Sequence, residues 1–352
     1  MPQSDERLDK AFGQRPTLRD FFCAFQDQFG RSITPSILAI DTKEIPVPVN
    51  VELLAGFRDL LVASIIPLGW SRVNQEGENP YCILYSDNLA FYPFAPSRNA
   101  EFVGSMTPAS LSLDETSKFL GQTTPGIPRI NLTDISLDRF LYETLLCQWH
   151  KHFIRRKRGL SSRRLFRSLN MANEAARIPG GRETGIYDYG RAIALWISAF
   201  EILSHPGGKE RTDVLSVERL FDRADWTLKK LSIRYYKPLW IPRNQKSKTG
   251  KTNLAKTLYH RLHKCRNAFI HGNPVRVSDI KYPGKGLPLY QSAPLLYRMV
   301  LAGYLQMKIN RPDASQELSD YDRKEYAERI FTQSQIESGL LAVQHGSQRP
   351  HP

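Results

Sequence analysis

The sequence predicts a mainly α-helical protein, in which a C-terminal helical bundle follows a smaller N-terminal α+β domain. Beyond residue 136, apolar residues recur at intervals of three and four in a succession of segments. Gly and Pro residues separate these segments. Before residue 130, short runs rich in aromatic and branched residues alternate with turn-like stretches, which is typical of strands. We therefore expect domains at 1–132 and 133–312, then a C-terminal helix and a disordered tail at 313–352.

In the N-terminal part, one helix is expected around 51–65. The runs "YCILY" (81–85) and "LAFYPF" (89–94) are expected to form a hairpin or short strands. We find no residues there that predict a catalytic or binding site.

The bundle is predicted from six amphipathic or apolar segments. They span residues 136–158, 162–178, 187–204, 213–231, 253–271 and 291–308. A further helix is expected over 318–344, ahead of the polar residues that end the sequence.

The composition is that of an ordinary globular protein except for its charge. The chain has 352 residues, of which 41% are hydrophobic, and this is enough for a sizeable core and for two domains. The formal net charge of +14 favours polyanions such as RNA, DNA or an anionic membrane surface. A basic surface without a particular partner is the alternative that charge alone leaves open.

Cysteine spacing and hydropathy indicate where in the cell the protein is located. The four cysteines are far apart and form no C-x-x-C pair, so neither a disulfide framework nor a structural zinc site is predicted. The most apolar runs are too short to cross a bilayer, and the first residues are polar and mixed in charge. We expect a cytoplasmic protein with no membrane partner.

The most informative stretch is "LHKCRNAFIHGNPV" (262–275), which ends a predicted helix. At about 100° per residue, an apolar stripe forms the buried face, and a polar stripe lies beside it: His260, His263, Asn267 and His271. Gly272 suits the position after a helix end, and Pro274 prevents the helix from resuming.

These histidines allow two simple interpretations. His271 and Lys264 could merely favour a helix C-terminus, where positive charge is stabilising. The histidines could also bind a metal ion, but His260 and His271 lie about 16 Å apart along the axis, too far to share one ion. We therefore predict no metal ion and no cofactor.

A carboxylate in an earlier apolar helix gives a second clue. Glu201 lies in the last turn of a segment that is apolar nearly all round, where the helix dipole disfavours negative charge. An unpaired buried carboxylate costs several kcal/mol, so Glu201 needs a cationic partner, and Arg266 is the candidate we favour. Exposure to solvent, or pairing with Arg191 or Lys209, is the alternative.

The motif "RNAFIH" (266–271) resembles the R-N-x-x-x-H form of the HEPN superfamily motif, in a context similar to Apea-like HEPN domains. The resemblance covers residues 136–310, and residues 1–132 have no counterpart in it. It implies a helical domain that forms a homodimer and acts as a metal-independent endoribonuclease. It also implies a toxin or antiviral defence effector, and an acidic residue on an earlier helix, which Glu201 matches by helix order.

The resemblance and the side-chain chemistry together assign expected roles. His271 is expected to act as general acid or base, and Arg266 to hold the phosphate. Asn267 would fix the tautomer of His271 or orient the phosphate, and Glu201 would hold Arg266. Attack by the RNA 2′-hydroxyl would leave a 2′,3′-cyclic phosphate. The N-terminal part would sense a trigger, restrain the nuclease or bind a regulatory protein partner.

A basic run, "HKHFIRRKRGLSSRRLFR", is where we expect the RNA backbone to bind. The expected contact residues are Arg155, Arg156, Arg158, Arg163 and Arg164. The same run could instead be a solvated junction between helices. Two other functions stay open: a non-catalytic HEPN-like module that binds RNA or a nucleotide or only dimerises, and a helical DNA-binding regulator, for which no helix-turn-helix spacing is visible.

Overall fold

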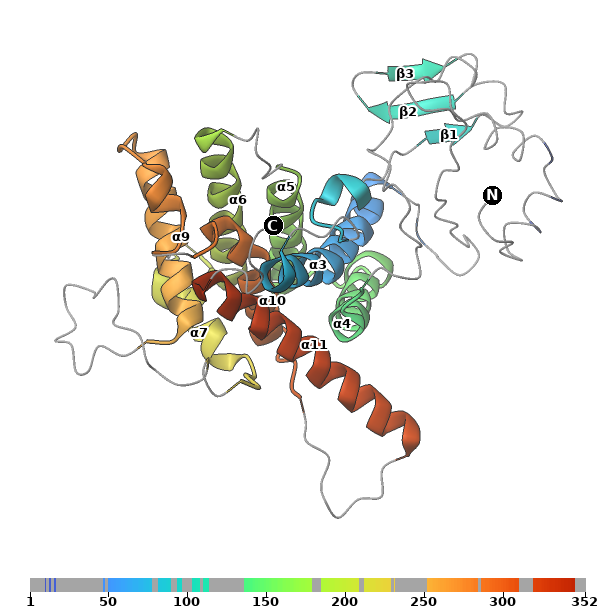
Figure 1. Cartoon of the computed structure of the whole chain (residues 1–352). Coiled ribbons are helices and arrows are strands. Elements are labelled where there is room, and N and C mark those ends of the chain that lie inside the picture. The colour runs from blue at the N-terminus through green and yellow to red at the C-terminus, as the bar shows by residue number, and fades with distance from the viewer. Residues whose placement is uncertain are drawn as a thin grey trace. The chain divides into compact units, whose positions relative to one another are not determined.

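The computed structural model shows a mainly helical protein, as the sequence predicts. Apart from a few isolated positions, the residues that it describes are 50–77, 82–89, 94–96, 103–107, 110–113, 136–178, 185–208, 212–228, 252–283, 286–309 and 319–345. Figure 1 shows the elements with their labels.

The chain divides into two compact units, but not at the expected boundary. One unit contains residues 1–55 and 90–128, and the other contains 56–89 and 129–352. Residues 56–89 therefore belong to the helical unit instead of an N-terminal domain that ends at 132. The reason is that most of helix α3 (Val51–Glu76) is a core helix, with Leu60 fully buried and Ile66 nearly so.

The first unit contains a small antiparallel sheet with the order β1-β2-β3. Its strands are β1 (Phe94–Pro96), β2 (Val103–Thr107) and β3 (Ser110–Leu113). In its register, Ala95 of β1 lies opposite Gly104 of β2. These three short strands do not establish the expected α+β domain, because the helix assigned to that domain packs in the other unit.

The strand expected at 81–85 is not found in its described part, 82–85. Ile83 is instead buried in the helical unit, and the indole of Trp70 donates a hydrogen bond to the carbonyl of Leu84 at 3.0 Å. A 3-10 turn, η1 (Ser86–Leu89), follows. The apolar residues that suggested a strand thus pack on α3. The rest of the predicted strand pair lies largely outside the described residues.

The predicted helices of the bundle are present with small shifts of their ends. They are α4 (Arg139–Trp149), α5 (Leu160–Ala176), α6 (Ile186–Ser204), α7 (Val214–Arg223), α9 (Leu254–Ile270), α10 (Ala293–Tyr304) and α11 (Asp320–His345). Helix α4 continues into a π-helical turn, η4 (His150–Ile154), and short 3-10 turns lie at η5 (Val277–Ile280) and η6 (Leu289–Ser292). The segment expected to be helical over 213–231 ends early, at Arg223.

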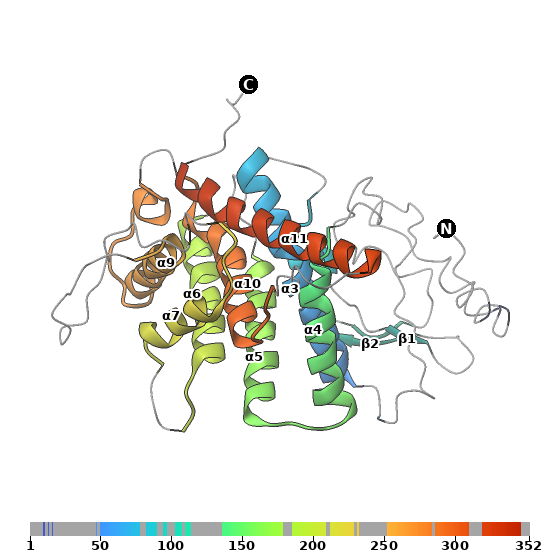
Figure 2. The ribbon, with the colours of Figure 1, turned by 90° about the horizontal axis from the view of Figure 1, so that it is seen from below.

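Helix α6 lies at the centre and packs against α5, α9 and α10 (Figures 1 and 2). Its buried side chains include Ile193, Ile197 and Phe200. The hydroxyl of Ser168 on α5 donates to the carbonyl of Ala199 at 2.7 Å and also meets the hydroxyl of Tyr297 on α10. The three helices are therefore joined by hydrogen bonds inside an apolar core.

Helices α6 and α9 pack antiparallel, and this sets the positions of the candidate residues. Near the start of α6, a Cβ on Gly190 would lie 2.5 Å from the ring of Phe269, near the end of α9. Near the end of α6, the rings of Phe200 and Tyr259 have centroids 5.3 Å apart. The C-terminal end of α9 therefore lies beside the N-terminal end of α6.

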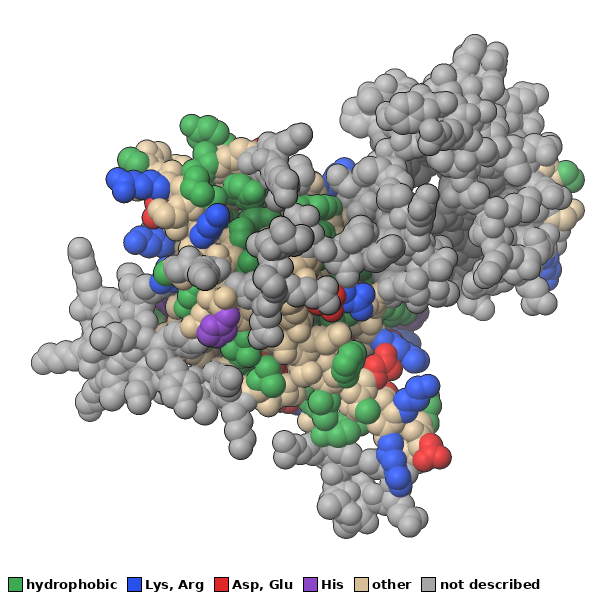
Figure 3. Space-filling model, in the orientation of Figure 1, with side chains coloured by type: hydrophobic (Ala, Val, Ile, Leu, Met, Phe, Trp, Pro, Cys, Tyr) green, Lys and Arg blue, Asp and Glu red, His purple; other side chains and the backbone are tan. Residues whose placement is uncertain are grey.

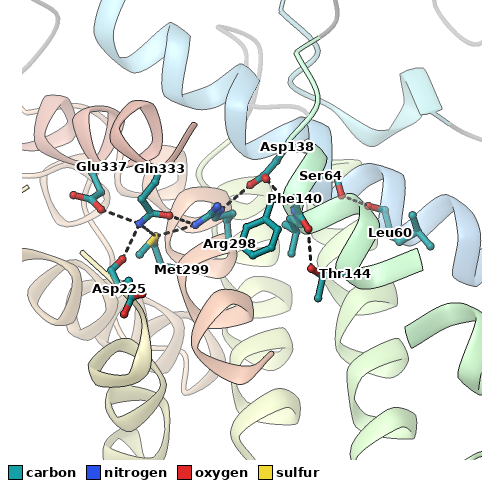
Figure 4. Close-up of polar contacts among 11 residues, drawn as sticks. Leu60, Ser64, Asp138, Phe140, Thr144, Asp225, Arg298, Met299, Gln333 and Glu337 are labelled. Carbon is teal, nitrogen blue, oxygen red and sulfur yellow. Dashed lines mark hydrogen bonds and ion pairs between the residues drawn. The ribbon is translucent and has the colours of Figure 1, made fainter. Parts of the chain in front are cut away.

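The C-terminal helix α11 is part of the helical unit and crosses over α10 and α3 (Figure 2). A buried polar network holds it there (Figure 4). Arg298 of α10 pairs with Asp138 at 2.8 Å and donates to Gln333 of α11. The amide of Gln333 donates to Glu337, whose carboxylate also accepts the backbone N–H groups of Thr227 and Leu228.

Among the helices that the structure describes, none combines the length and the apolar character that a membrane crossing requires.

Candidate functional site

Glu201 and Arg266 lie next to each other across the α6–α9 interface. The Arg266 Nη2 atom is 3.6 Å from the Glu201 Oε2 atom, and each side chain is about a quarter exposed. Burial raises the pKa of Glu201 above its usual value, and the nearby Arg266 charge lowers it only in part. The structure thus contains the pairing expected from sequence. The alternative partner Arg191 instead pairs with Asp188 at 3.1 Å, and Lys209 lies outside the described residues.

Asn267 and a further residue, His263, complete a closed set of contacts. The Asn267 Oδ1 atom accepts a hydrogen bond from Arg266 Nη1 at 3.0 Å. The Asn267 Nδ2 atom lies 3.4 Å from His263 Nδ1, and the other ring nitrogen of His263 lies 3.7 Å from Glu201 Oε1. We call these four residues, Glu201, His263, Arg266 and Asn267, the polar ring.

His263 was not among the predicted site residues, although the sequence held a signal for it. His263 precedes Asn267 by four positions in the polar stripe, but the R-N-x-x-x-H spacing directed attention to His271. The pKa of His263 is lowered from 6.5 to about 4, first because it is buried and second because Arg266 and His260 are near. His263 is therefore neutral at neutral pH, and its contact with Glu201 is not an ion pair.

The buried side chain of Tyr259 packs next to the polar ring, through its contact with His263. Tyr259 is fully buried, and its ring centroid is 6.1 Å from that of His263. Burial raises the pKa of Tyr259, so its hydroxyl stays neutral. Neither this hydroxyl nor the Nε atom of Arg266 has a hydrogen-bond partner within the described part of the chain. Both atoms could therefore form a further hydrogen bond at this site.

His260, in the same stripe, has a separate role at the α7–α9 contact. Its Nε2 atom lies 2.5 Å from a carboxylate oxygen of Glu218, which also faces Lys256 at 3.6 Å. Burial alone would raise the pKa of Glu218, but the hydrogen bond from His260 and the Lys256 charge keep it below its usual value. No set of three or more His, Cys, Asp or Glu side chains suited to a metal ion occurs among the described residues.

His271 lies at the end of α9, where the sequence predicted the helix to stop. Gly272 follows with a φ of +68°, a conformation that favours Gly, and the N–H of Asn273 bonds to the carbonyl of Ala268 at 2.9 Å. This hydrogen bond satisfies one of the carbonyls that the helix end leaves free. The His271 side chain is exposed, and among the described residues it has no hydrogen-bond partner.

The structure does not bring His271 together with the polar ring in one chain. Arg266 extends toward Glu201, which lies near the end of α6, whereas His271 lies near the start of α6. His271 follows His263 by eight residues, which is about 12 Å along the α9 axis at 1.5 Å per residue. Among the described residues, Arg266 contacts Glu201 and Asn267, and no hydrogen bond or ion pair joins it to His271.

The basic run forms the turn between α4 and α5, and most of its arginines are exposed as expected. Arg155, Arg156, Arg158 and Arg163 face solvent. Arg164 differs, because its guanidinium donates to the carbonyl of His205 and, at 3.3 Å, to that of Pro206. Arg164 therefore holds the start of α5 to the end of α6, and the exposed arginines lie toward the end of α6 that carries Glu201.

Comparison with known proteins yields no match to this chain among family models, curated proteins or solved structures. The HEPN resemblance therefore rests on the "RNAFIH" motif and its helical context.

Proposed function

We propose that this chain is a metal-independent endoribonuclease that uses the 2′-hydroxyl of its RNA substrate as the nucleophile. The observation that carries the proposal is the contact between Glu201 and Arg266, with Asn267 bonded to the same guanidinium. A guanidinium that is held but still partly exposed is suited to bind a phosphate and to stabilise the charge that develops on it.

The proposed reaction needs only proton transfer and charge stabilisation. A base takes the proton of the 2′-hydroxyl, the 2′-oxygen bonds to phosphorus, and the bond from phosphorus to the 5′-oxygen breaks. An acid returns a proton to that oxygen, which leaves a 2′,3′-cyclic phosphate and a 5′-hydroxyl. His271 is the group for proton transfer, because its imidazole is exposed and can either accept or donate a proton.

A homodimer would supply what a single chain lacks. Because the Arg266 guanidinium and the His271 imidazole lie apart along one α9, a shared site needs the end of α9 from a second copy. Exposed apolar side chains at this end of the bundle support such a contact: Tyr187 is 83% exposed, Ile270 54% and Val277 59%. Figure 3 shows hydrophobic and Lys or Arg side chains together over the start of α6 and the end of α9.

The exposed arginines of the α4–α5 turn are proposed to bind the RNA backbone. A net charge of +14 supports capture of a polyanion. The proposed role as a toxin or defence effector rests on the HEPN resemblance alone, and the proposed cytoplasmic location rests on the cysteine spacing. A regulatory role for the N-terminal part also rests on that resemblance.

The test is an RNA cleavage assay with the wild-type chain and with Arg266→Ala and His271→Ala. Loss of His271 should lower the rate by about 10²–10⁴, the usual size of acid–base catalysis. Loss of Arg266 should cost about 10²–10³. The matched controls Arg276→Ala and His345→Ala remove the same side-chain types from exposed positions and should keep full activity.

The products and conditions sharpen the test. The cleaved RNA should end in a 2′,3′-cyclic phosphate, EDTA should have no effect, and RNA with 2′-deoxy sugars at the cleaved positions should resist. Full activity of His271→Ala, or inhibition by EDTA, would contradict the mechanism.

A non-catalytic module that binds RNA or a nucleotide is the second candidate. The observation in its favour is that Arg266 is already engaged by Glu201 and Asn267 while His271 stands apart from them. This candidate predicts RNA binding by the wild-type chain without cleavage, and weaker binding by Arg266→Ala. The same set of variants therefore separates the two functions.

A further inference from the structure

The polar ring allows the proton positions of its members to be assigned from geometry. An arginine side chain only donates hydrogen bonds, so the Asn267 atom that Arg266 meets at 3.0 Å must be the carbonyl oxygen. The amide nitrogen of Asn267 then faces His263 Nδ1 at 3.4 Å. An amide nitrogen only donates, so His263 Nδ1 must be the acceptor and carry no proton.

The remaining proton of His263 therefore lies on Nε2, which faces the Glu201 carboxylate at 3.7 Å. The carboxylate thus faces the Nε2 proton on one side and the Arg266 guanidinium on the other, at 3.6 Å, and both separations are longer than a hydrogen bond. Every contact of the ring then has a donor and an acceptor. A flipped Asn267 amide, a proton on His263 Nδ1 or a doubly protonated His263 would each place two donors against each other.

We propose that His263 is a positioning residue of this site: a neutral imidazole, protonated on Nε2, that orients Glu201 and Asn267 and through them holds the Arg266 guanidinium. As a residue of the nuclease site it rests on the proposed function, but the ring itself does not. His263 acts through the other members of the ring, so it differs from His271, the proposed proton-transfer group.

The surroundings of His263 agree with a neutral ring. The groups that face it are Glu201 from α6 and Arg266, His260, Asn267 and Tyr259 from α9. Burial and the Arg266 and His260 side chains oppose a positive charge on His263, and among the described residues that face it only Glu201 favours one. The contact with the buried Tyr259 ring restricts the orientation of the imidazole further.

The first experiment reads the proton positions without any assay of activity. The full chain is labelled with ¹⁵N-histidine, and the His263 signals are assigned by comparison with His263→Gln. Between about pH 5.5 and 8, across the usual histidine range, His263 should be neutral with its proton on Nε2. A proton on Nδ1, or titration near the ordinary histidine pKa, would overturn the proposal.

The second experiment changes the donor that His263 faces. In Asn267→Asp a carboxylate replaces the amide, so it should favour a proton on His263 Nδ1, with which it can form a hydrogen bond, and raise the pKa of His263. Asn273→Asp, which adds the same charge at an exposed position beyond the helix end, is the control and should leave the His263 signals in place. Unchanged His263 signals in Asn267→Asp would also overturn the proposal.

The third experiment tests the positioning role in RNA cleavage. His263→Phe keeps an aromatic ring on Tyr259 but removes both polar contacts, and it should lower kcat by about 10²-fold, as expected when a catalytic group is misplaced. KM should change little. His263→Gln keeps an acceptor and a donor, so its kcat should be much closer to that of the wild type. Equal activity of His263→Phe and His263→Gln would contradict the positioning role of His263. If the wild-type chain cleaves no RNA but both NMR experiments give the expected result, the proposed nuclease function is wrong and the proposed proton positions in the polar ring are confirmed.

Discussion

At the scale of single residues, electrostatics alone predicts that Glu201 needs a cationic partner. A carboxylate in the last turn of a buried helix is unfavourable, so its need for a cation could be predicted from sequence. The structure supplies Arg266, at a distance longer than a hydrogen bond, and burial still outweighs that charge in its effect on the pKa of Glu201. Burial of the Glu201 carboxylate therefore costs free energy, which the Arg266 charge offsets only in part.

The lowered pKa of His263 predicts a loss of stability in acid. Between about pH 6.5 and 4 the unfolded chain binds a proton at this residue and the folded chain does not. The free energy of unfolding should therefore fall as the pH drops through this range. At 1.36 kcal/mol per pKa unit the loss is at most about 3 kcal/mol, and solvent screening at a partly exposed side chain reduces it.

Urea unfolding of the wild-type chain and of His263→Gln, measured from about pH 7 down to pH 4, checks this prediction. The variant should lose less stability than the wild type over this range. Glu201 acts in the opposite direction, because a carboxyl with a raised pKa favours the folded state as the pH falls. Parallel curves for the two proteins would show that His263 is not held neutral by the fold.

At the scale of elements, the ends of the helices followed local rules that the sequence displays. Asn253 caps α9 by accepting the N–H of Lys256 at 2.9 Å, and Gly272 ends the same helix. Local rules did not predict which arginines of the α4–α5 turn are exposed. Its arginines look alike in sequence, but Arg164 is bound to α6 while its neighbours are exposed.

This difference predicts two separate effects of arginine substitution in the turn. Replacing Arg155, Arg156 and Arg158 together by Ala should flatten the dependence of log K on log salt for single-stranded RNA, by about 0.7 for each phosphate that is no longer neutralised. Arg164→Ala should leave that slope unchanged and lower the stability of the fold instead. Salt titrations of RNA binding, with urea unfolding of the same variants, check both effects. An unchanged slope in the triple variant would remove the turn from the RNA-binding surface.

At the scale of the whole molecule, the buried network around Arg298 joins parts of the chain that are distant in sequence. Arg298 and its partner Asp138 are almost fully buried, and Gln333 and Glu337 extend the network to α11 (Figure 4). The tail expected as a separate C-terminal region is therefore a structural part of the bundle as far as residue 345.

Arg298→Met should destabilise the chain strongly, because it leaves the Asp138 carboxylate buried without its cation. Removal of one partner of a buried ion pair typically costs about 3–5 kcal/mol. The control Arg139→Met breaks an exposed pair with Glu143 and should cost no more than about 0.5 kcal/mol. Urea unfolding measures both, and similar losses for the two variants would contradict a structural role for the network.

The proposed homodimer gives a prediction on association. Ile270→Asp places a charge on the exposed apolar surface at the end of α9 and should convert dimers to monomers in sedimentation experiments. RNA cleavage should fall with it, because the shared site no longer forms. Phe331→Asp, a matched change at an exposed apolar position on α11, should leave the dimer intact. A monomeric wild-type chain that cleaves RNA would exclude a shared site.

The sequence by itself determined the helical class, the helices of the bundle, the end of α9 at His271 and the need of Glu201 for a cationic partner. These features depend on periodicity, caps and charges within or next to single helices, which act over a few residues. Only the tertiary structure decided that α3 lies in the core, that Arg164 binds the chain at the end of α6, and that His263 and Arg266 both meet Glu201. Those outcomes depend on which faces of distant helices meet, because packing brings together side chains whose separation along the chain has no fixed spacing.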